Sequence, residues 1–369
     1  MTSVLISGAS VAGLAAAHWL RRTGCAVTVV ERAPGLRPGG QALDVRGVAL
    51  DVLERGGQLA EARAARTTMR GMSMLDGSGA EQWRSTEATW SAGRLDSPDI
   101  EIFRDDLTAL LHRHAQDGVE YLFGDSATAL EQDADEVRVD FLSGQRRTFD
   151  LVVGADGLHS TVRRLAFGPE ERYVHHLGAH LGVFRSANIL GLEDWQLWLR
   201  EGNASLCVYP TRDNSELRTI LGFRSAPLAL DRHDTVAQQQ LLTEKLGHLG
   251  GPAPRLLAAM REAPDFFFDA MAQIHMDRWS EGRVVLIGDA AHCPSPLSGQ
   301  GSSLALSGAY VLADEVGRAG GDHRAAFAGY ERRMRQFATL NQALATEHPD
   351  GPAPDEAMDR AKNALRLDG

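Results

Sequence analysis

The sequence predicts a mixed α/β fold in which a Rossmann-like dinucleotide-binding domain is interleaved with an antiparallel-sheet domain and followed by a long C-terminal helix. Three observations lead to this prediction. A strand, a glycine-containing turn, a helix and a second strand open the chain over residues 4–31. Alternating strand patterns then fill residues 180–224. A last buried strand at 283–287 returns to the first lobe, and the chain beyond 302 is mainly helical.

No repeat or low-complexity linker separates the two lobes, so we expect each to be assembled from segments distant in the sequence. The expected first lobe comprises residues 1–68, 95–168 and 270–310. The expected second lobe comprises 69–94 and 169–269, and 311–369 forms a C-terminal helical segment. Its helix is expected over Asp322–Glu347, where an apolar stripe recurs at helical spacing.

Composition excludes several classes of protein. The chain has 369 residues, 43% of them apolar and 24% charged, as expected for two packed globular lobes. A net charge of −11 argues against nucleic acid or an anionic membrane as a partner. The apolar stretch 4–20 lacks a preceding basic region and is interpreted as a strand and buried helix, with no membrane span predicted elsewhere. Three cysteines without paired or metal-ligand spacing favour a reducing, cytoplasmic location.

The opening turn predicts a dinucleotide site. It reads Gly8-Ala9-Ser10-Val11-Ala12-Gly13, with Glu31-Arg32 at the end of the second strand. Gly8 permits the tight turn, Gly13 lets the helix pack closely, and the free amides at the helix start suit a pyrophosphate. Glu31 suits ribose hydroxyls and disfavours a 2′-phosphate, so NAD or FAD fits better than NADP. Ser10 replaces the usual glycine, and a purely structural turn is the alternative.

A second candidate site lies near the end of the last buried strand. That strand delivers Asp289 to the carboxyl edge of the sheet, where ligands of open α/β sheets bind and where a carboxylate can accept from sugar hydroxyls. The run Pro296-Leu-Ser-Gly299-Gln300-Gly301 then exposes backbone amides at the start of a helix, which favour a nearby anion. The alternative for Asp289 is a simple cap of the turn that follows it.

The motifs in this order resemble the class A flavoprotein monooxygenases, the family of para-hydroxybenzoate hydroxylase, over about residues 1–340. A third motif contributes to this resemblance. It reads Asp150-Leu-Val-Val-Gly-Ala-Asp156-Gly157-Leu-His-Ser-Thr-Val-Arg163. The segment Gly39–Gly47 is most similar to the tetracycline-inactivating branch and its aromatic-polyketide relatives. The resemblance implies non-covalent FAD, with Asp156 and Gly157 near the pyrophosphate, Asp289 at the ribityl chain, and Arg104 beside the flavin. It also places Asp44 and Arg46 beside the flavin ring, although a solvated loop charge explains Arg46 equally well.

The resemblance also implies an activity. We expect hydroxylation of an aromatic or polyketide-like small molecule by O2 through a flavin C4a-hydroperoxide, with NADPH or NADH binding transiently, because there is no second glycine fingerprint. Such oxygen transfer needs a dry pocket rather than a protein nucleophile, so no general acid or base is assigned. A monomer or weak dimer is expected. The histidines show no metal-ligand spacing, and no metal is predicted.

The resemblance implies substrate contacts on the alternating strands. Gln196 and Trp198 share one face of a strand, and Arg218 lies on a nearby one, so these three are the predicted pocket residues, with sheet packing as the alternative. A halogenase of the same fold is disfavoured, since Trp195-Gln-Leu-Trp198-Leu departs from the Trp-x-Trp-x-Ile-Pro motif. A flavin-dependent reductase without oxygen insertion and a non-catalytic flavin-containing ligand-binding protein remain as alternatives.

Overall fold

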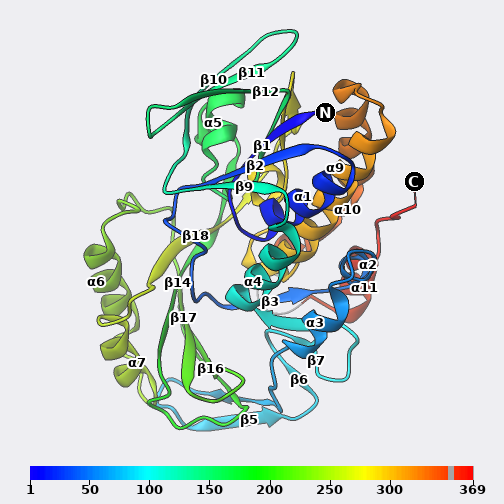
Figure 1. Ribbon diagram of the computed structural model, residues 1–369. Helices are drawn as coiled ribbons and strands as arrows, with labels where there is room; N and C mark the ends of the chain where they lie inside the picture. The colour runs from blue at the N-terminus through cyan, green and yellow to red at the C-terminus, as the bar shows by residue number, and fades with distance from the viewer. Residues whose placement is uncertain (348–352, 369) are drawn as a thin grey trace.

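The computed structural model describes residues 1–347 and 353–368, and a six-stranded, mainly parallel sheet forms its centre (Figure 1). The strand order is β19-β20-β13-β1-β2-β9, and only the β19–β20 pair is antiparallel. The strands are β1 (Ser3–Ser7), β2 (Ala26–Glu31), β9 (Val119–Phe123), β13 (Leu151–Gly154), β19 (Ser280–Glu281) and β20 (Val284–Leu286). Segments from three distant parts of the chain therefore meet in one sheet, as the sequence predicted.

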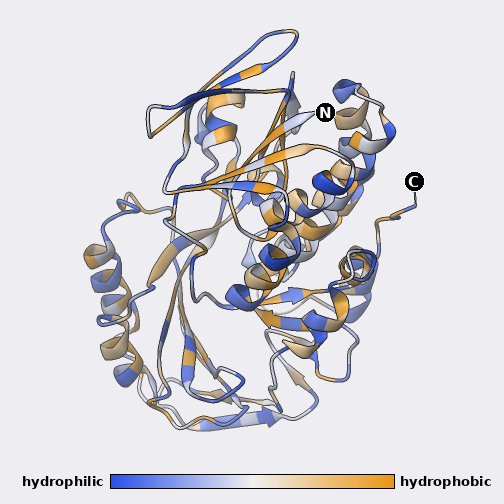
Figure 2. Ribbon diagram, in the orientation of Figure 1, coloured by the Kyte–Doolittle hydropathy of each residue, from blue (hydrophilic) through white to orange (hydrophobic). Residues whose placement is uncertain are grey.

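Helices cover this sheet and close the main core. Helix α1 packs against both α4 and α9, and α5 packs against β13 and β20. The helices are α1 (Val11–Arg22), α2 (Val48–Arg55), α3 (Leu59–Ala64), α4 (Arg104–Ala115), α5 (Thr161–Phe167), α8 (Asp289–His292) and α9 (Gly301–Arg318). The strands of the central sheet are mostly orange or pale in Figure 2, since both sheet faces are buried.

A seven-stranded sheet forms the second lobe. Its order is β18-β14-β17-β16-β15-β4-β5, antiparallel except for the parallel pair β15–β4. The strands are β4 (Met72–Leu75), β5 (Glu81–Ser85), β14 (Val174–Ala187), β15 (Gln196–Glu201), β16 (Ala204–Pro210), β17 (Glu216–Arg224) and β18 (Phe267–Ile274). Helices α6 (Thr235–Leu246) and α7 (Ala253–Met260) pack on one face around a second apolar core. Figure 2 shows them alternating between orange and blue, as amphipathic helices do.

Smaller elements connect the lobes. Strands β10 (Ala127–Gln132), β11 (Val137–Phe141) and β12 (Arg146–Phe149) form an antiparallel sheet beside α5. Strands β3 (Ala42–Val45) and β8 (Ile100–Phe103) form a two-stranded sheet, and β6 (Ala88–Thr89) and β7 (Gly93–Arg94) form a short hairpin. Two 3₁₀ turns, η1 (Glu170–Arg172) and η2 (Pro296–Ser298), lie on loops that border the cavity described below.

The C-terminal segment is helical and braces the first lobe. Helix α10 (His323–Glu347) packs on α9 and buries Phe327, Tyr330, Met334, Phe337 and Asn341, which confirms the predicted helix and its stripe. The short α11 (Asp355–Lys362) returns along α10. Within the described parts of the chain, no helix is long and apolar enough to cross a membrane.

Candidate functional site

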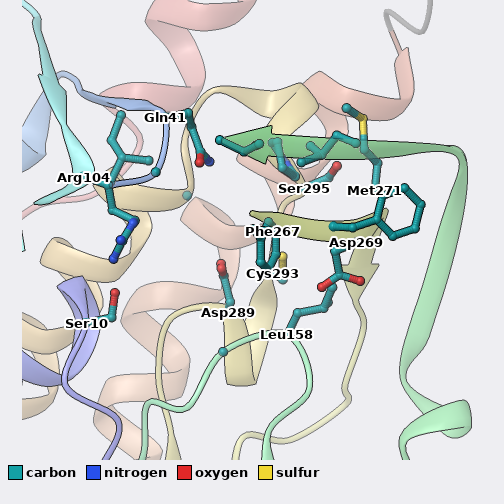
Figure 3. Close-up of a pocket in the computed structure, with 18 of the residues that line it drawn as sticks. Ser10, Gln41, Arg104, Leu158, Phe267, Asp269, Met271, Asp289, Cys293 and Ser295 are labelled. Atoms are coloured by element: carbon teal, nitrogen blue, oxygen red, sulfur yellow. The ribbon is translucent and has the colours of Figure 1, made fainter. Parts of the chain in front are cut away.

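A cavity of about 1950 Å³ lies between the two lobes. It is larger than a typical single-ligand pocket of about 300–1,000 Å³, so it has room for a cofactor and a second molecule together. Every residue predicted at the cofactor site lines it except Gly13. Figure 3 shows Ser10 and Arg104 on one side, Asp289 in the middle, and Leu158 and Asp269 on the other side.

The opening turn presents a helix start to this cavity. Gly8 has φ +106°, and a Cβ there would lie 2.5 Å from the Ala155 carbonyl oxygen. A Cβ on Gly13 would lie 1.9 Å from the Gly8 carbonyl oxygen, so Gly13 allows α1 to approach the turn. Ser10 makes no side-chain capping bond, and the first turn of α1 has no acidic residue. The first amides of α1 are therefore available to an anion in the cavity.

Glu31 stabilises the same turn. Its Oε2 accepts from the Ala9 amide at 2.9 Å, and its Oε1 accepts from the Ala33 amide at 2.8 Å. The half-buried side chain also lines the cavity, next to Arg32. A carboxylate has free lone pairs after two such bonds, so Glu31 can hold the turn and still accept from a ribose hydroxyl.

Asp289 and the start of α9 form the opposite wall. The Asp289 carboxyl is open to the cavity, but it lies deep in the molecule, and this burial raises its pKa. The N-cap of α8 is Gly288, so Asp289 does not have the capping role considered as the alternative. Gln300 precedes α9 and makes no side-chain capping bond to it, and the first turn of α9 has no acidic residue. A second helix start thus opens onto the same cavity.

The segment that joins these two features has a fixed, unusual backbone. Ser295 adopts φ +73°, which a non-glycine residue rarely does, and is 2% exposed. Gly299 follows η2 with φ +63°. The Ser298 hydroxyl donates to the Ser295 carbonyl at 2.9 Å and accepts from the Gln300 amide at 3.1 Å. These bonds hold Pro296–Gly301 in one conformation along the cavity wall.

A buried ion pair borders the site. Arg46 binds Asp44 at 2.8 Å, and both side chains are about one-tenth exposed, at 9% and 12%. Burial raises the pKa of Asp44 to about 7, although Arg46 opposes this shift. Arg46 also donates to the Ser91 carbonyl at 3.0 Å, and its own amide donates to the Ser303 hydroxyl at 3.0 Å. The solvated-loop alternative for Arg46 is therefore not what the structure shows.

Two predicted residues organise neighbouring backbone. Arg104 donates to the carbonyl oxygens of Arg37, Pro38 and Gly39 at 2.9, 3.0 and 2.7 Å, which shapes the loop beside the cavity. Asp156 accepts from the Thr161 and Val162 amides at 2.8 and 3.1 Å and caps α5. Gly157 is a cavity-lining residue with φ +84°.

The seven-stranded sheet contributes the remaining wall. Its strand registers place Trp83, Met74, Trp198, Cys207, Ile220, Val183 and Phe267 in one row across all seven strands. Residues directly opposite on paired strands share a face, and the last five of the row line the cavity. The row is apolar from Trp198 onward, so this wall is suited to an apolar ligand surface.

The substrate-pocket prediction needs correction for two of its three residues. Trp198 lines the cavity, but Gln196 and Arg218 lie outside the cavity lining, on the same face farther along their strands, and are 0% and 4% exposed. Gln196 is bonded to Trp198 and Ser91, and Arg218 is bonded to Asp105 and Glu216. Strand alternation identified the correct face, but it does not show where along a strand the cavity ends.

Sequence reasoning missed a bridge between the lobes. His159 contacts Glu170 at 2.8 Å through Nδ1 and Asp269 of β18 at 3.0 Å through Nε2. Burial lowers its pKa, but the two carboxylates outweigh this and raise it to about 9. The sequence around His159 does not indicate this bridge, because its acidic partners are 11 and 110 residues away along the chain. Among the described residues, no three metal-ligating side chains are grouped so as to hold a metal ion.

The fold and this cavity define a two-lobed dinucleotide-binding protein whose cavity extends beyond the dinucleotide end. The family model described as "FAD binding domain" matches residues 1–341, and the chain belongs to that family. The uncharacterized protein Rv1260 of Mycobacterium tuberculosis is 51% identical over 369 residues, which are 100% of this chain and 99% of that protein. A flavin-dependent monooxygenase of Legionella longbeachae is 38% identical over 92% of this chain and 86% of its own.

Solved structures agree with this assignment. The crystal structure of tetracycline destructase Tet(51) matches with a TM-score of 0.91 and 30% identity over 100% of both chains. The protein is therefore an FAD-dependent monooxygenase. The residues present fit FAD, because two uncapped helix starts and the cavity-facing carboxyl of Asp289 line one cavity large enough for the cofactor.

Proposed function

We propose that the enzyme takes electrons from NADPH or NADH and uses O2 to hydroxylate an aromatic or polyketide-like small molecule. The observation that carries this proposal is the continuity of the cavity. The same space is lined by the opening turn and Asp289 at one end and by the apolar row from Trp198 to Phe267 at the other. A cofactor at the first end can thus meet an apolar substrate at the second.

The residues along the first end have distinct proposed roles. The α1 amides at Ser10–Ala12 bind the FAD pyrophosphate, with Asp156 and Gly157 nearby, and Glu31 accepts from the adenosine ribose. Asp289 accepts from the ribityl hydroxyls. The amides of Gly299–Gly301 and the α9 start stabilise negative charge on the reduced ring, with Pro296 and the Asp44–Arg46 pair at its edges. Bound FAD supplies the activation of O2.

Water exclusion is the second requirement of such chemistry. The sheet wall offers the side chains of Cys207, Ile220 and Val183 on the cavity face, and each is apolar or weakly polar. Ser295 and Ser298 face the same cavity, but their hydroxyls are engaged within the η2 turn. This part of the wall therefore offers few groups that bind water, and a dry surface beside the flavin protects a reactive oxygen-carrying species from hydrolysis.

The cellular setting is part of the proposal. All three cysteines are free and buried, which suits a reducing compartment, and we assign the enzyme to the cytoplasm. We also propose that it works as a monomer or weak dimer.

An isotope experiment tests the reaction. The purified holoenzyme is incubated with NADPH or NADH under ¹⁸O2 with tetracycline and a panel of phenols and naphthols, and products are analysed by mass spectrometry. We expect substrate-dependent oxidation of the nicotinamide and one ¹⁸O atom in the product, with none from labelled water. Turnover that proceeds equally without O2 would instead indicate a reductase, and tight ligand binding with no turnover would indicate a flavin-containing binding protein.

A further inference from the structure

Two tryptophans form a corner of the cavity beside the apolar row. Trp198 comes from β15, and Trp90 comes from the turn of the β6–β7 hairpin. Their ring centroids are 5.2 Å apart with an interplanar angle of 58°, and both line the cavity. The hairpin thus adds a second aromatic surface at an angle to the sheet. In Figure 1 it lies near the end of the sheet that carries β5.

The corner continues to the molecular surface. Trp83 precedes Trp198 in the cross-strand row, separated from it by Met74. The Trp83 ring lies 6.2 Å from that of Trp90 and is 43% exposed, whereas Trp90 and Trp198 are half-buried. Aromatic surface therefore extends from the exterior into the cavity.

A buried hydrogen-bond chain holds the corner in place. The Trp198 indole N–H donates to the Gln196 Oε1 at 2.5 Å, and the Gln196 amide nitrogen donates to the Ser91 hydroxyl at 2.8 Å. Gln196 is fully buried, so both bonds are shielded from water. Ser91 is adjacent to Trp90, and its side chain is also bonded to the buried carboxyl of Glu101. One glutamine thus fixes both tryptophans relative to each other.

The same chain connects the corner to the cofactor lobe. The Ser91 carbonyl accepts from Arg46, whose other contact is the Asp44 carboxylate. Because the Trp198 N–H is used internally, that residue presents its ring rather than a donor to a ligand. Two aromatic faces at an angle favour a planar fused-ring ligand, which can stack on one ring and meet the other by its edge.

We propose that Trp90 and Trp198 are the specificity-determining residues of the substrate compartment, that they select planar fused aromatic rings, and that Gln196 is a positioning residue that acts through them. The inference rests on the proposed hydroxylation of an aromatic molecule, since it names the part of the cavity that selects that molecule. It assigns to Gln196 a role without substrate contact, in accord with its complete burial outside the cavity lining.

Equilibrium binding on the oxidised holoenzyme tests this without turnover. Calorimetry compares 2-naphthol with 2-decalol, which has the same carbon skeleton but is saturated and not planar. We expect the wild-type protein to bind 2-naphthol about tenfold more tightly, since each aromatic contact contributes about three- to tenfold. Trp90→Leu and Trp198→Leu should each remove most of this preference. Trp195→Leu is the matched control, because Trp195 does not line the cavity and donates to Ser73.

The Gln196→Met variant tests the positioning role. Met approximates the volume of Gln but makes neither hydrogen bond, so the 2-naphthol preference should fall about threefold. The exciton couplet of the close Trp90–Trp198 pair in far-ultraviolet circular dichroism should weaken in parallel, whereas FAD content should not change. A merely structural role would lower stability without altering either readout, and this outcome would overturn the assignment of Gln196.

The outcomes separate this inference from the proposed function. If ¹⁸O enters a product but both tryptophan variants keep the full 2-naphthol preference, the corner is not the selective element, and the inference fails alone. An equal loss of the 2-naphthol preference in Trp195→Leu would also show that the corner is not the selective element. If oxygenation is absent but the preference disappears only in the corner variants, the aromatic site stands and the proposed function fails. Because Trp90 lies on a surface hairpin, its variant remains informative even if Trp198→Leu does not fold.

Discussion

At the scale of single residues, the Asp289 carboxyl lies deep in the molecule and yet is open to the cavity. The side chain faces the cavity, and burial raises its pKa. Keeping the Asp289 carboxylate charged at this depth costs free energy, which implies a ligand that donates hydrogen bonds to the carboxylate. We predict that Asp289→Ala weakens FAD binding by about 1.5–3 kcal/mol, or roughly ten- to a hundredfold, because a bond to a charged acceptor is lost.

Fluorescence titration of the apoprotein with FAD measures this effect. Asp117→Ala is the control, since Asp117 is an exposed residue outside the cavity. Equal FAD affinity in the two variants would show that Asp289 has no contact with the cofactor. A loss in both would point to a general effect of charge instead.

Predicted residues line the cavity where a motif fixes the backbone, and do so less consistently on the alternating strands. Gly8 and Asp289 come after buried parallel strands and Glu31 ends one, and the carboxyl edge of a parallel sheet determines where such residues lie. Arg218 and Gln196 follow from the family resemblance together with strand alternation, and both lie outside the cavity lining. Trp90, which we propose as a selective residue, lies in the turn of a hairpin whose two strands have only two residues each. The sequence pattern of so short a hairpin cannot be distinguished from that of a loop.

At the scale of elements, the contact between the opening turn and α1 depends on a glycine. A Cβ at Gly13 would lie 1.9 Å from the Gly8 carbonyl oxygen, and backbone cannot yield as a side-chain tip can. We predict that Gly13→Ala displaces the start of α1, lowers FAD affinity by more than about tenfold and lowers the melting temperature. Gly35→Ala is the matched control, because nothing lies within 4 Å of its Cβ position.

Calorimetric melting and FAD titration of both glycine variants test the prediction. Retention of normal FAD affinity in Gly13→Ala would mean that the turn and helix can separate without affecting the cofactor. In that case the amides of α1 would not be the main pyrophosphate ligands.

Element boundaries show which sequence signals are reliable. Helix α1, strand β2 and the strands β15–β17 lie in the stretches where the sequence predicted them, residues 4–31 and 180–224, because glycine turns and alternation mark them. Strand β18, at Phe267–Ile274, was not predicted, and its pairing with β14 spans the expected lobe boundary at 269/270. Its sequence, Phe-Phe-Asp-Ala-Met-Ala-Gln-Ile, does not alternate clearly. Only the neighbouring strand determines that this segment is extended.

At the scale of the whole molecule, a charged histidine that lines the cavity makes one of the contacts between the lobes. His159 belongs to the loop after β13, whereas Asp269 belongs to β18 of the other lobe. Glu170 binds the other ring nitrogen and is itself paired with Arg163 at 3.2 Å, with Arg232 at 3.9 Å. Two carboxylates and one imidazolium thus form a contact that requires His159 to be protonated.

The final prediction follows from this protonation requirement. The folded-state pKa of His159, about 9, lies above the ordinary value of 6.5. Its stabilising contribution is therefore fully present below about pH 6.5 and is lost as the pH rises through about 9. The side chain is 29% exposed, so we expect a loss of about 1–3 kcal/mol over this interval. His159→Gln should remove most of that pH dependence, whereas His248→Gln, an exposed-surface control, should retain it. Melting temperatures of the holoenzyme, measured across this pH interval, give the change in stability with pH. If wild type and His159→Gln show the same change, the histidine contact does not hold the lobes together.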